Sequence, residues 1–338
     1  MNPWYSLFTA LIAVLALVVL ALIGAGAISL SAIFGIVIPY VAFAVFMIGI
    51  IYRVLEWAKI PVPFKITTTC GQGRSLPWMK QAKLDCPFTT WEVIGRMFLE
   101  VFLFRSLFRN VRAELRDGPK QTFASSKWLW LFGIIFHYSF LTIVLRHVRF
   151  FTEPVPMWVQ AISGLDGFFD IFVPTLFLTD IAFLLAVAYL FLRRVIVPQV
   201  RYISLAADYF PLFLIMAIGI TGILMRQLLH VDILKVKELA VGLAAFSPSA
   251  PKDLGVLFYT HLFLVSVLIA YFPFSKLMHA PGVFLSPTRN MANDNRAVRY
   301  VNPWETELNS VTKVHSYEHY EDDFREKMKE AGIPVDKE

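Results

Sequence analysis

Four of the seven histidines of this 338-residue chain stand in two strongly apolar segments. His137 and His147 are ten residues apart, and His261 and His279 are 18 residues apart. Eighteen residues make about five whole helical turns and a rise of about 27 Å, so the second pair would lie on one helix face near opposite edges of a membrane about 30 Å thick. A neutral imidazole is a common axial ligand of haem iron. The spacing therefore predicts a membrane helix that supplies one ligand to each of two stacked cofactors.

The composition predicts an all-α, polytopic membrane helix bundle with a polar C-terminal tail. Hydrophobic residues make up 57% of the chain and charged residues only 17%, and the mean hydropathy is +0.61. No charged side chain precedes Arg53, which leaves room for two retained spans and no basic segment typical of a cleaved signal peptide. Six transmembrane helices are expected, at residues 6–29, 32–56, 127–150, about 171–192, 203 to about 229, and 254–279.

Charge placement orients these spans. Residues 57–127 hold 12 lysines and arginines against 5 acidic residues, whereas residues 280–338 hold 8 against 11. The positive-inside rule places the basic loop, the turn with Arg193, Arg194 and Arg201, and both termini in the cytoplasm of a prokaryotic inner membrane. The basic charge is thus a signal of topology and not of nucleic-acid binding. The predicted regions are an N-terminal hairpin (1–57), a basic cytoplasmic loop (58–127), a four-helix di-haem cytochrome b domain (128–279) and a cytoplasmic tail (280–338).

Two further helices are expected outside the spans. Between Phe88 and Arg116 an apolar series runs beside a basic series, which predicts an amphipathic helix on an anionic lipid surface. The apolar series is Val101, Phe104, Phe108, Val111 and Leu115, and the basic one is Arg105, Arg109, Arg112 and Arg116. Tyr317 to Glu330 predicts a short charged helix in the tail. His315 and His319 are four residues apart there, a spacing that suits either a metal site or a solvated helix face.

Antiparallel packing of the third and sixth spans brings the histidines into two pairs. His137 comes toward the level of His279, and His147 toward that of His261. One histidine from each of two facing helices gives a six-coordinate haem suited to electron transfer. The fit is imperfect, because ten residues rise only about 15 Å and leave His137 and His147 about 80° apart around their helix. Pro273 is expected to kink the sixth helix between its histidines.

Two other interpretations of the histidines remain possible from the sequence. They could be polar contacts between helices of a haem-free bundle, or proton relays of a proton-coupled transporter. Only two cysteines, Cys70 and Cys86, are present, so the chain cannot hold an iron–sulfur cluster alone and a redox function needs another subunit. Cys70 is either a partner contact or redox group, or an ordinary thiol.

Several residues near the predicted spans have a chemical and a structural interpretation. Asp180, placed in the middle of the fourth span, either assists proton movement from a quinol or hydrogen-bonds a neighbouring helix. Gly219 and Gly222 either admit a flat macrocycle or mark a close helix crossing. The candidates for contacts with haem propionates or a quinone head group are Arg146, Arg149, Arg226 and His230, whose alternative role is interfacial anchoring.

The histidine pattern resembles a known family. The spacings of ten and 18 residues, with the sequence Phe-Pro-Phe-Ser-Lys at 272–276 leading into His279, are similar to the gamma subunit family of respiratory nitrate reductase, a membrane cytochrome b with two haems. The resemblance covers about residues 120–285. It implies that His137 with His279 would hold the haem iron nearer the cytoplasm and His147 with His261 the outer one.

The chain departs from that subunit by an extra N-terminal span, a long basic loop that includes residues 67–72, and a tail of nearly 60 residues. These additions resemble the DsrM group, the membrane cytochrome b of the sulfite-reductase-associated DsrMKJOP complex. That resemblance implies two haem b groups, exchange of electrons with menaquinone, and a cytoplasmic iron–sulfur subunit resembling DsrK and heterodisulfide reductase, within dissimilatory sulfur metabolism (sulfate respiration). The complex would be either quinol-oxidising or quinone-reducing. A gamma subunit of a respiratory nitrate reductase is the alternative.

Overall fold

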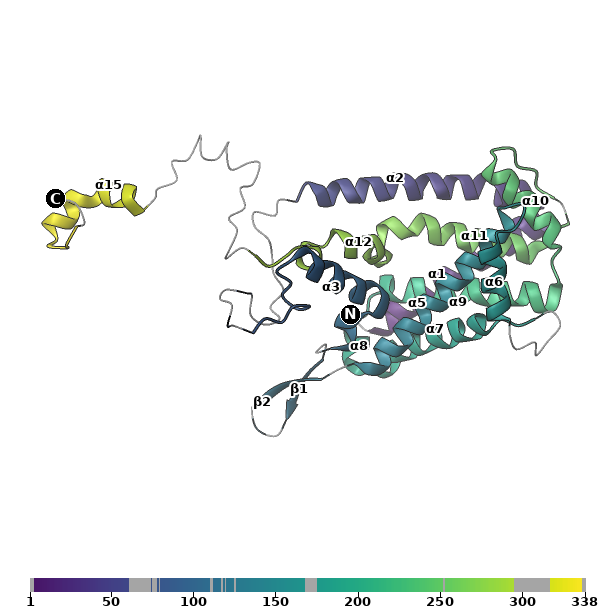
Figure 1. Cartoon of the computed structure of the whole chain (residues 1–338). Helices are drawn as coiled ribbons and strands as arrows, with labels where there is room; N and C mark the ends of the chain where they lie inside the picture. The colour runs from purple at the N-terminus through teal and green to yellow at the C-terminus, as the bar shows by residue number, and fades with distance from the viewer. Residues whose placement is uncertain are drawn as a thin grey trace. The chain divides into compact units, whose positions relative to one another are not determined.

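The computed structural model forms two compact units, one of residues Met1–Ile60 and Met97–Leu285, and one of residues Pro61–Arg96 and Ser286–Glu338. Figure 1 shows the long helices of the first unit running side by side. The structure describes residues 3–60, 74, 78, 80–109, 112–116, 118, 120–124, 126–167, 175–251, 253–294 and 317–335.

Six long helices build the bundle of the first unit. They are α1 (Pro3–Ala21), α2 (Ile38–Ala58), α5 (Lys127–His147), α7 (Leu178–Ile196), α9 (Ala206–Leu224) and α11 (Val256–Tyr271). Helix α5 packs against α7, α7 against α9, α9 against α1 and α11, and α11 against α2. The two histidine-bearing helices, α5 and α11, are therefore connected through their contacts with α7 and α9.

Shorter elements extend or connect these helices. Turns of π-helix continue α1 and α9 and precede α2, and the remaining helices lie in the connections. The elements are η1 (Leu22–Ala27), η2 (Ile33–Val37), η3 (Val148–Phe150), α6 (Met157–Asp166), α8 (Pro198–Ile203), η4 (Met225–Leu229) and α10 (Ile233–Ala244).

Within the part of the chain that the structure describes, five helices are long and apolar enough to cross a membrane. They are Trp4–Ala27, Ile33–Ala58, Lys127–Phe150, Ala206–Leu229 and Val256–Phe274. Their positions confirm the prediction of a helical membrane bundle. Helix α7, which corresponds to the predicted fourth span, is not among the five and holds three charged residues, Asp180, Arg193 and Arg194. The placement of Asp180 in the middle of a span is wrong, because α7 begins at Leu178 and Asp180 lies in its first turn.

The bundle has an apolar core and an apolar exterior. Leu214 of α9 and Leu264 of α11 are fully buried in one core, which also contains Phe34 and Phe263. Many large apolar side chains point outward instead, as does Ile48 of α2, which is 68% exposed. A continuous apolar outer surface is unfavourable in water and suits hydrocarbon, which fits the membrane assignment.

The prediction of one continuous helix from Leu254 to His279 is wrong for the second half of this segment. Helix α11 ends at Tyr271, and two 3₁₀ turns follow, η5 (Phe272–Phe274) and η6 (Lys276–Met278), before α12 (His279–Leu285). Pro273 has no amide hydrogen to continue the helix, so the chain breaks there rather than only kinking. Ser275 then adopts an extended conformation and accepts a hydrogen bond from the Leu277 amide at 3.1 Å. His279 therefore stands at the start of a new helix.

The predicted amphipathic helix is also shorter than expected. Helix α3 (Thr90–Leu103) is present, but Phe104 takes a left-handed conformation with φ 49° and only the single turn α4 (Arg105–Phe108) follows. Arg112 and Arg116 instead begin and end strand β1 (Arg112–Arg116), which pairs antiparallel with β2 (Lys120–Ala124). The three-residue connection contains Gly118 at φ 84°, a backbone geometry typical of tight hairpins that outweighs the helical spacing.

The second unit includes a loop, the beginning of α3, the turn α13 (Pro287–Asn290) and the tail helix α15 (Tyr317–Glu330), whose bounds agree with the prediction. Cys86 is buried in this unit and accepts a hydrogen bond from the Asn293 amide group, with 3.4 Å between Nδ2 and Sγ. Cys70, His315 and the side chain of His319 lie outside the described residues.

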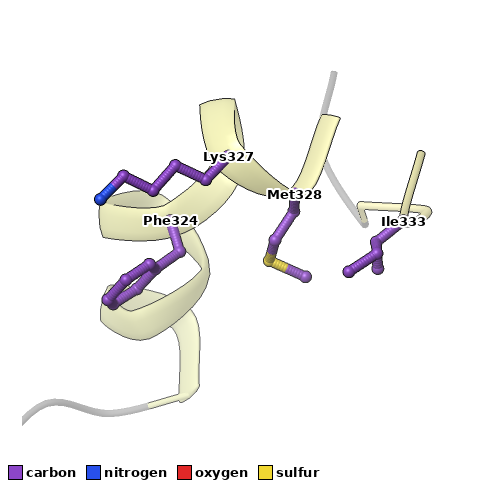
Figure 2. A pocket seen from close by; sticks show the side chains of 4 residues that line it. All are labelled: Phe324, Lys327, Met328 and Ile333. Carbon is purple, nitrogen blue, oxygen red and sulfur yellow. The ribbon is translucent and has the colours of Figure 1, made fainter. Parts of the chain in front are cut away.

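The tail helix has a small hollow of about 280 Å³, shown in Figure 2. The residues that line it are Phe324, Lys327, Met328 and Ile333. None of these side chains is a haem ligand of the predicted set, so the hollow is not the cofactor site.

Candidate cofactor site

The structure brings His137 and His279 together, although 142 positions separate them in the sequence. His137 lies in the middle of α5, and His279 is the first residue of α12. Their ring centroids are 5.9 Å apart, and the ring planes are nearly perpendicular at 87°. Two imidazoles that bind one metal ion at about 2 Å each have ring centres roughly 6 Å apart. Both rings would therefore be able to hold one iron atom between them, with His279 presented by the segment that follows the chain break after Tyr271.

All four histidines have the Nδ1 atom occupied by a hydrogen bond to oxygen. His137 Nδ1 lies 2.7 Å from the Gly133 carbonyl oxygen, and His147 Nδ1 lies 2.7 Å from that of Ile143. His279 Nδ1 is 2.8 Å from the Lys276 carbonyl oxygen.

A carbonyl oxygen can only accept a hydrogen bond, so each of these three rings carries its proton on Nδ1. The lone pair of a neutral ring is then on Nε2, which is the form that coordinates a metal.

The second predicted pair is His147, the last residue of α5, and His261, in the interior of α11. Their pairing stays a prediction. His261 Nδ1 lies 2.9 Å from the hydroxyl oxygen of Thr221 in α9. Gly222 lies beside the same ring, since a Cβ atom at this position would be 3.3 Å from His261 Cε1. The glycine thus allows the His261 ring to lie close to the α9 backbone.

Aromatic side chains surround His137 and fill the bundle beside it. The rings of Phe104 and Phe136 approach His137 edge-on, with centroids at 4.9 and 5.0 Å. Phe136 also stacks on Phe183 of α7 at 5.8 Å. Gly219 makes room for Phe183, because a Cβ there would lie 2.7 Å from the Phe183 ring. Gly219 therefore marks a close helix crossing, the structural alternative for this residue.

A buried ionic cluster lies at the end of α5 next to His147. The Arg146 guanidinium is 3.2 Å from Asp166 Oδ2 and 2.5 Å from Asp180 Oδ1, and the Arg146 side chain is only 7% exposed. Asp166 also accepts hydrogen bonds from the amide and the hydroxyl of Thr179, at 2.9 and 2.6 Å. The cluster joins α5, α6 and α7. Because two carboxylates already engage Arg146, its main contacts are within the protein.

The other three residues predicted to contact a haem propionate or a quinone lie in different environments. Arg226 donates from Nε to the Thr175 carbonyl at 2.9 Å, and its guanidinium lies 4.1 Å from the ring centre of Phe177, which the Arg146 guanidinium also contacts at 3.7 Å. Arg149 lies over the Phe150 ring at 5.7 Å. His230 is exposed and ends the π-helical turn η4 in a left-handed conformation with φ 49°. Contacts of these residues with a quinone or a propionate stay predictions.

The donor set fits haem better than a protein-ligated metal ion. Within the described part of the chain, no group of three or more His, Cys, Asp or Glu side chains is placed to hold a metal ion. A haem iron requires only two axial ligands from the protein, because the macrocycle supplies the other four. His137 and His279, with Nε2 available, meet that requirement for one haem, and the second pair stays a prediction.

The sequence analysis missed three residues that contact the histidines or their neighbours. Thr221 and Asp166 give no periodic signal of their own, and their partners are 40 and 20 positions away in the sequence. Asp208 accepts a hydrogen bond from the Lys276 ammonium, with 2.6 Å between Nζ and Oδ1. The sequence could have indicated Asp208 only as an acidic residue in the first turn of a helix. There it also accepts a hydrogen bond from the Leu205 amide.

Comparison with known proteins identifies a family and two relatives. Residues 88–300 match the family described as "Nitrate reductase gamma subunit". The chain is 47% identical over 283 residues to the "Hdr-like menaquinol oxidoreductase cytochrome b-like subunit" of Archaeoglobus fulgidus, which is 82% of this chain and 84% of that protein. It is 44% identical over 275 residues to the protein of the same description from Archaeoglobus profundus, covering 79% and 81% of the two chains.

The match includes the histidine-bearing helices α5 and α11 and the whole of α7 and α9 between them. The bundle, its spans and the relatives at this level of identity support a multi-pass membrane subunit of cytochrome b type. The chain belongs to the nitrate reductase gamma subunit family.

Proposed function

We propose that this protein is a di-haem cytochrome b that relays electrons across the membrane between menaquinol and a cytoplasmic iron–sulfur subunit. His137 and His279 would be the axial ligands of the inner haem, nearer the cytoplasm, and His147 and His261 those of the outer haem. Haem b supplies one-electron redox chemistry when it is bound. The protein holds, orients and insulates the two groups.

The observation that carries this proposal is the common hydrogen-bonding state of the four histidines. Each Nδ1 is bonded to an oxygen atom, at 2.7–2.9 Å. A histidine that ligates a metal almost always donates its other ring N–H in this way, which fixes the ring and its tautomer. Histidines that served as proton relays would instead need both nitrogens accessible to donors and acceptors in turn.

The menaquinol and partner assignments are supported by resemblance and by charge. The description of both relatives names a menaquinol oxidoreductase that is "Hdr-like". The basic loop at 57–127 and the acid-rich tail offer complementary surfaces for a partner subunit. We place the partner on the cytoplasmic side, as a DsrK-like subunit resembling heterodisulfide reductase, and the complex in dissimilatory sulfur metabolism. A nitrate reductase gamma subunit is the second candidate, supported by the family match.

An optical spectrum of the purified protein tests the haem assignment. The expected result is a Soret band, an α-band that appears on reduction, and two haem b groups per chain by extraction. The His319→Ala variant in the tail is a matched control and should keep both haems. Protein that is purified intact from haem-replete cells and shows no Soret band would refute the proposal and leave the transporter interpretation.

The electron donor and the partner need separate experiments. Addition of a reduced menaquinone analogue to the oxidised protein should develop the α-band, and a quinol-insensitive spectrum would contradict the quinone assignment. Purification in mild detergent followed by iron–sulfur quantitation and mass spectrometry identifies the partner. An iron–sulfur subunit resembling DsrK supports the proposed complex, whereas nitrate reductase subunits would support the second candidate.

The orientation is tested by reporter fusions. A fluorescent reporter after residue 338 should be active in the cytoplasm, and a periplasmic reporter inserted after Pro156, between α5 and α6, should be active outside. These two results together require an odd number of spans between Pro156 and the C-terminus, so that α7 crosses the membrane together with α9 and α11. A C-terminal reporter that is active only outside would contradict six spans with cytoplasmic termini.

A further inference from the structure

Helix α9 carries no histidine of the candidate site, yet its polar residues reach one ligand of each pair. Near the end of the helix, the Thr221 hydroxyl bonds directly to His261. In its first turn, Asp208 binds the Lys276 side chain, and the Lys276 carbonyl accepts from His279. The helix therefore influences both sites without supplying a ligand.

The contact between Thr221 and His261 has a defined direction. A threonine hydroxyl has a single hydrogen, and Thr221 donates it to the Ala217 carbonyl at 2.8 Å, with the Ile218 carbonyl also near at 3.0 Å. Only the lone pairs of the hydroxyl oxygen remain for His261. The Nδ1–H of His261 thus donates to Thr221, and the Nε2 lone pair is left for a metal.

This contact differs in kind from the contacts of the other three ligands. His137, His147 and His279 donate to backbone carbonyl oxygens, which no side-chain substitution removes. His261 is the one of the four whose Nδ1 lies against a side-chain hydroxyl, from a different helix, and the Ile218 carbonyl of the same helix is a second acceptor for this ring. Thr221 is 7% exposed, so bulk water does not readily replace the hydroxyl when it is removed.

We propose that Thr221 is a positioning residue that holds His261 in its ligating form and lowers the reduction potential of the outer haem. The inference rests on the proposed function. A hydrogen bond from Nδ1–H makes Nε2 a stronger electron donor, which favours ferric over ferrous iron. Loss of the acceptor should therefore raise the potential of the haem that His261 ligates, and leave the other haem unchanged.

The test is a redox titration of the purified protein, followed at the α-band, for the wild type and the Thr221→Val variant. The His261→Ala variant identifies the outer haem as the component that disappears. That component should titrate at a higher potential in Thr221→Val, with the other component unmoved, and Thr221→Ser should return it to the wild-type value.

The matched control is Thr260→Val. Thr260 precedes His261 in α11, is 1% exposed, and donates its hydroxyl hydrogen to the Val256 carbonyl at 2.9 Å. The substitution makes the same chemical change beside the ligand without removing a ligand contact, so both potentials should stay at wild-type values.

The outcomes separate this inference from the proposed function. A wild-type protein without haem refutes the proposed function itself. Two haems whose potentials are the same in Thr221→Val and Thr260→Val refute only the role of Thr221. If Thr221→Val does not yield folded protein, Thr221→Ala and Thr221→Ser give the same comparison, since the potential must follow the hydroxyl group.

Discussion

The ammonium group of Lys276 lies 2.6 Å from Asp208 Oδ1, and the same lysine holds His279 through its carbonyl oxygen. The Asp208 side chain is only 4% exposed, whereas that of Lys276 is 71% exposed. A buried carboxylate on α9 thus anchors the 3₁₀ turn that presents His279. Arg194 adds a more distant positive charge, 3.9 Å from the same oxygen.

Replacement of Asp208 by asparagine should weaken the His137/His279 site. The amide keeps the shape of the side chain but loses the charge that attracts Lys276, a loss of about 1 kcal/mol for a half-exposed pair. We expect faster loss of the inner haem on warming, measured by the decay of its α-band component, while the outer haem is retained. Glu56→Gln, which removes the exposed pair with Arg53 at 3.9 Å, is the control and should have no effect. Equal decay of both haems in Asp208→Asn would contradict this role.

Gly49→Ala should disturb the same site from the opposite side. A Cβ at Gly49 of α2 would lie 2.7 Å from Pro273 Cβ and 3.2 Å from the Phe274 ring, so α2 and the chain break must separate. Overpacking of this kind costs about 1–3 kcal/mol. The expected result is a lower midpoint of thermal unfolding together with reduced occupancy of the inner haem. Gly164→Ala in α6 meets nothing within 4 Å and should leave both quantities unchanged. An unchanged midpoint in Gly49→Ala would show that this packing is not restrictive.

Asp166→Asn should destabilise the bundle more than an exposed charge change does. It leaves the buried Arg146 paired with Asp180 but removes the charge of its second partner, and loss of a hydrogen bond to a charged group costs about 1.5–3 kcal/mol. We expect poor recovery of folded protein and early loss of the outer haem, because His147 follows Arg146 directly. Asp253→Asn removes the exposed pair with Lys235 at 3.1 Å and serves as the control. A wild-type unfolding midpoint in Asp166→Asn would mean that the cluster contributes little to stability.

Single histidine substitutions test the pairing of the ligands. His261→Ala should remove the outer haem and keep the inner one, and His279→Ala should do the reverse, because each ring serves one iron. Haem quantitation should fall from two groups to one in either variant, and the remaining spectral component should differ between them. Loss of both haems to the same extent from a protein that still elutes as a folded species would contradict the pairing of His137 with His279 and of His147 with His261.

Hydropathy alone predicts most of the bundle, because a membrane span must be long, apolar and helical. The third span, predicted at Lys127–Phe150, agrees with the structure at both ends. The candidate ligands also follow from sequence, since few ionisable groups occur in the spans. Helix α7 corresponds to the span predicted at about 171–192, but it holds three charged residues, and its crossing of the membrane stays a prediction.

Competition between local backbone preferences explains the errors in the predicted amphipathic helix and in the predicted sixth helix. The series from Phe88 to Arg116 fits a helix, but the turn around Gly118 favours a hairpin, and spacing does not tell which local preference prevails. Pro273 predicted an interruption of the sixth helix, but the sequence does not distinguish a kinked helix from one that ends there. The pairs between Arg146 and Asp180 and between Thr221 and His261 join positions 34 and 40 residues apart, which only tertiary packing brings together.

Because the helix ends at Tyr271, the His147/His261 site and the His137/His279 site are held by different kinds of structural element. His147 and His261 both belong to long helices, so their geometry is complete once α5 and α11 have docked in the bundle. His279 instead stands beyond two short turns and can reach His137 only after those turns have formed. The proposed inner site therefore depends on the correct folding of the segment from Phe272 to His279, whereas the proposed outer site depends on the packing of long helices alone.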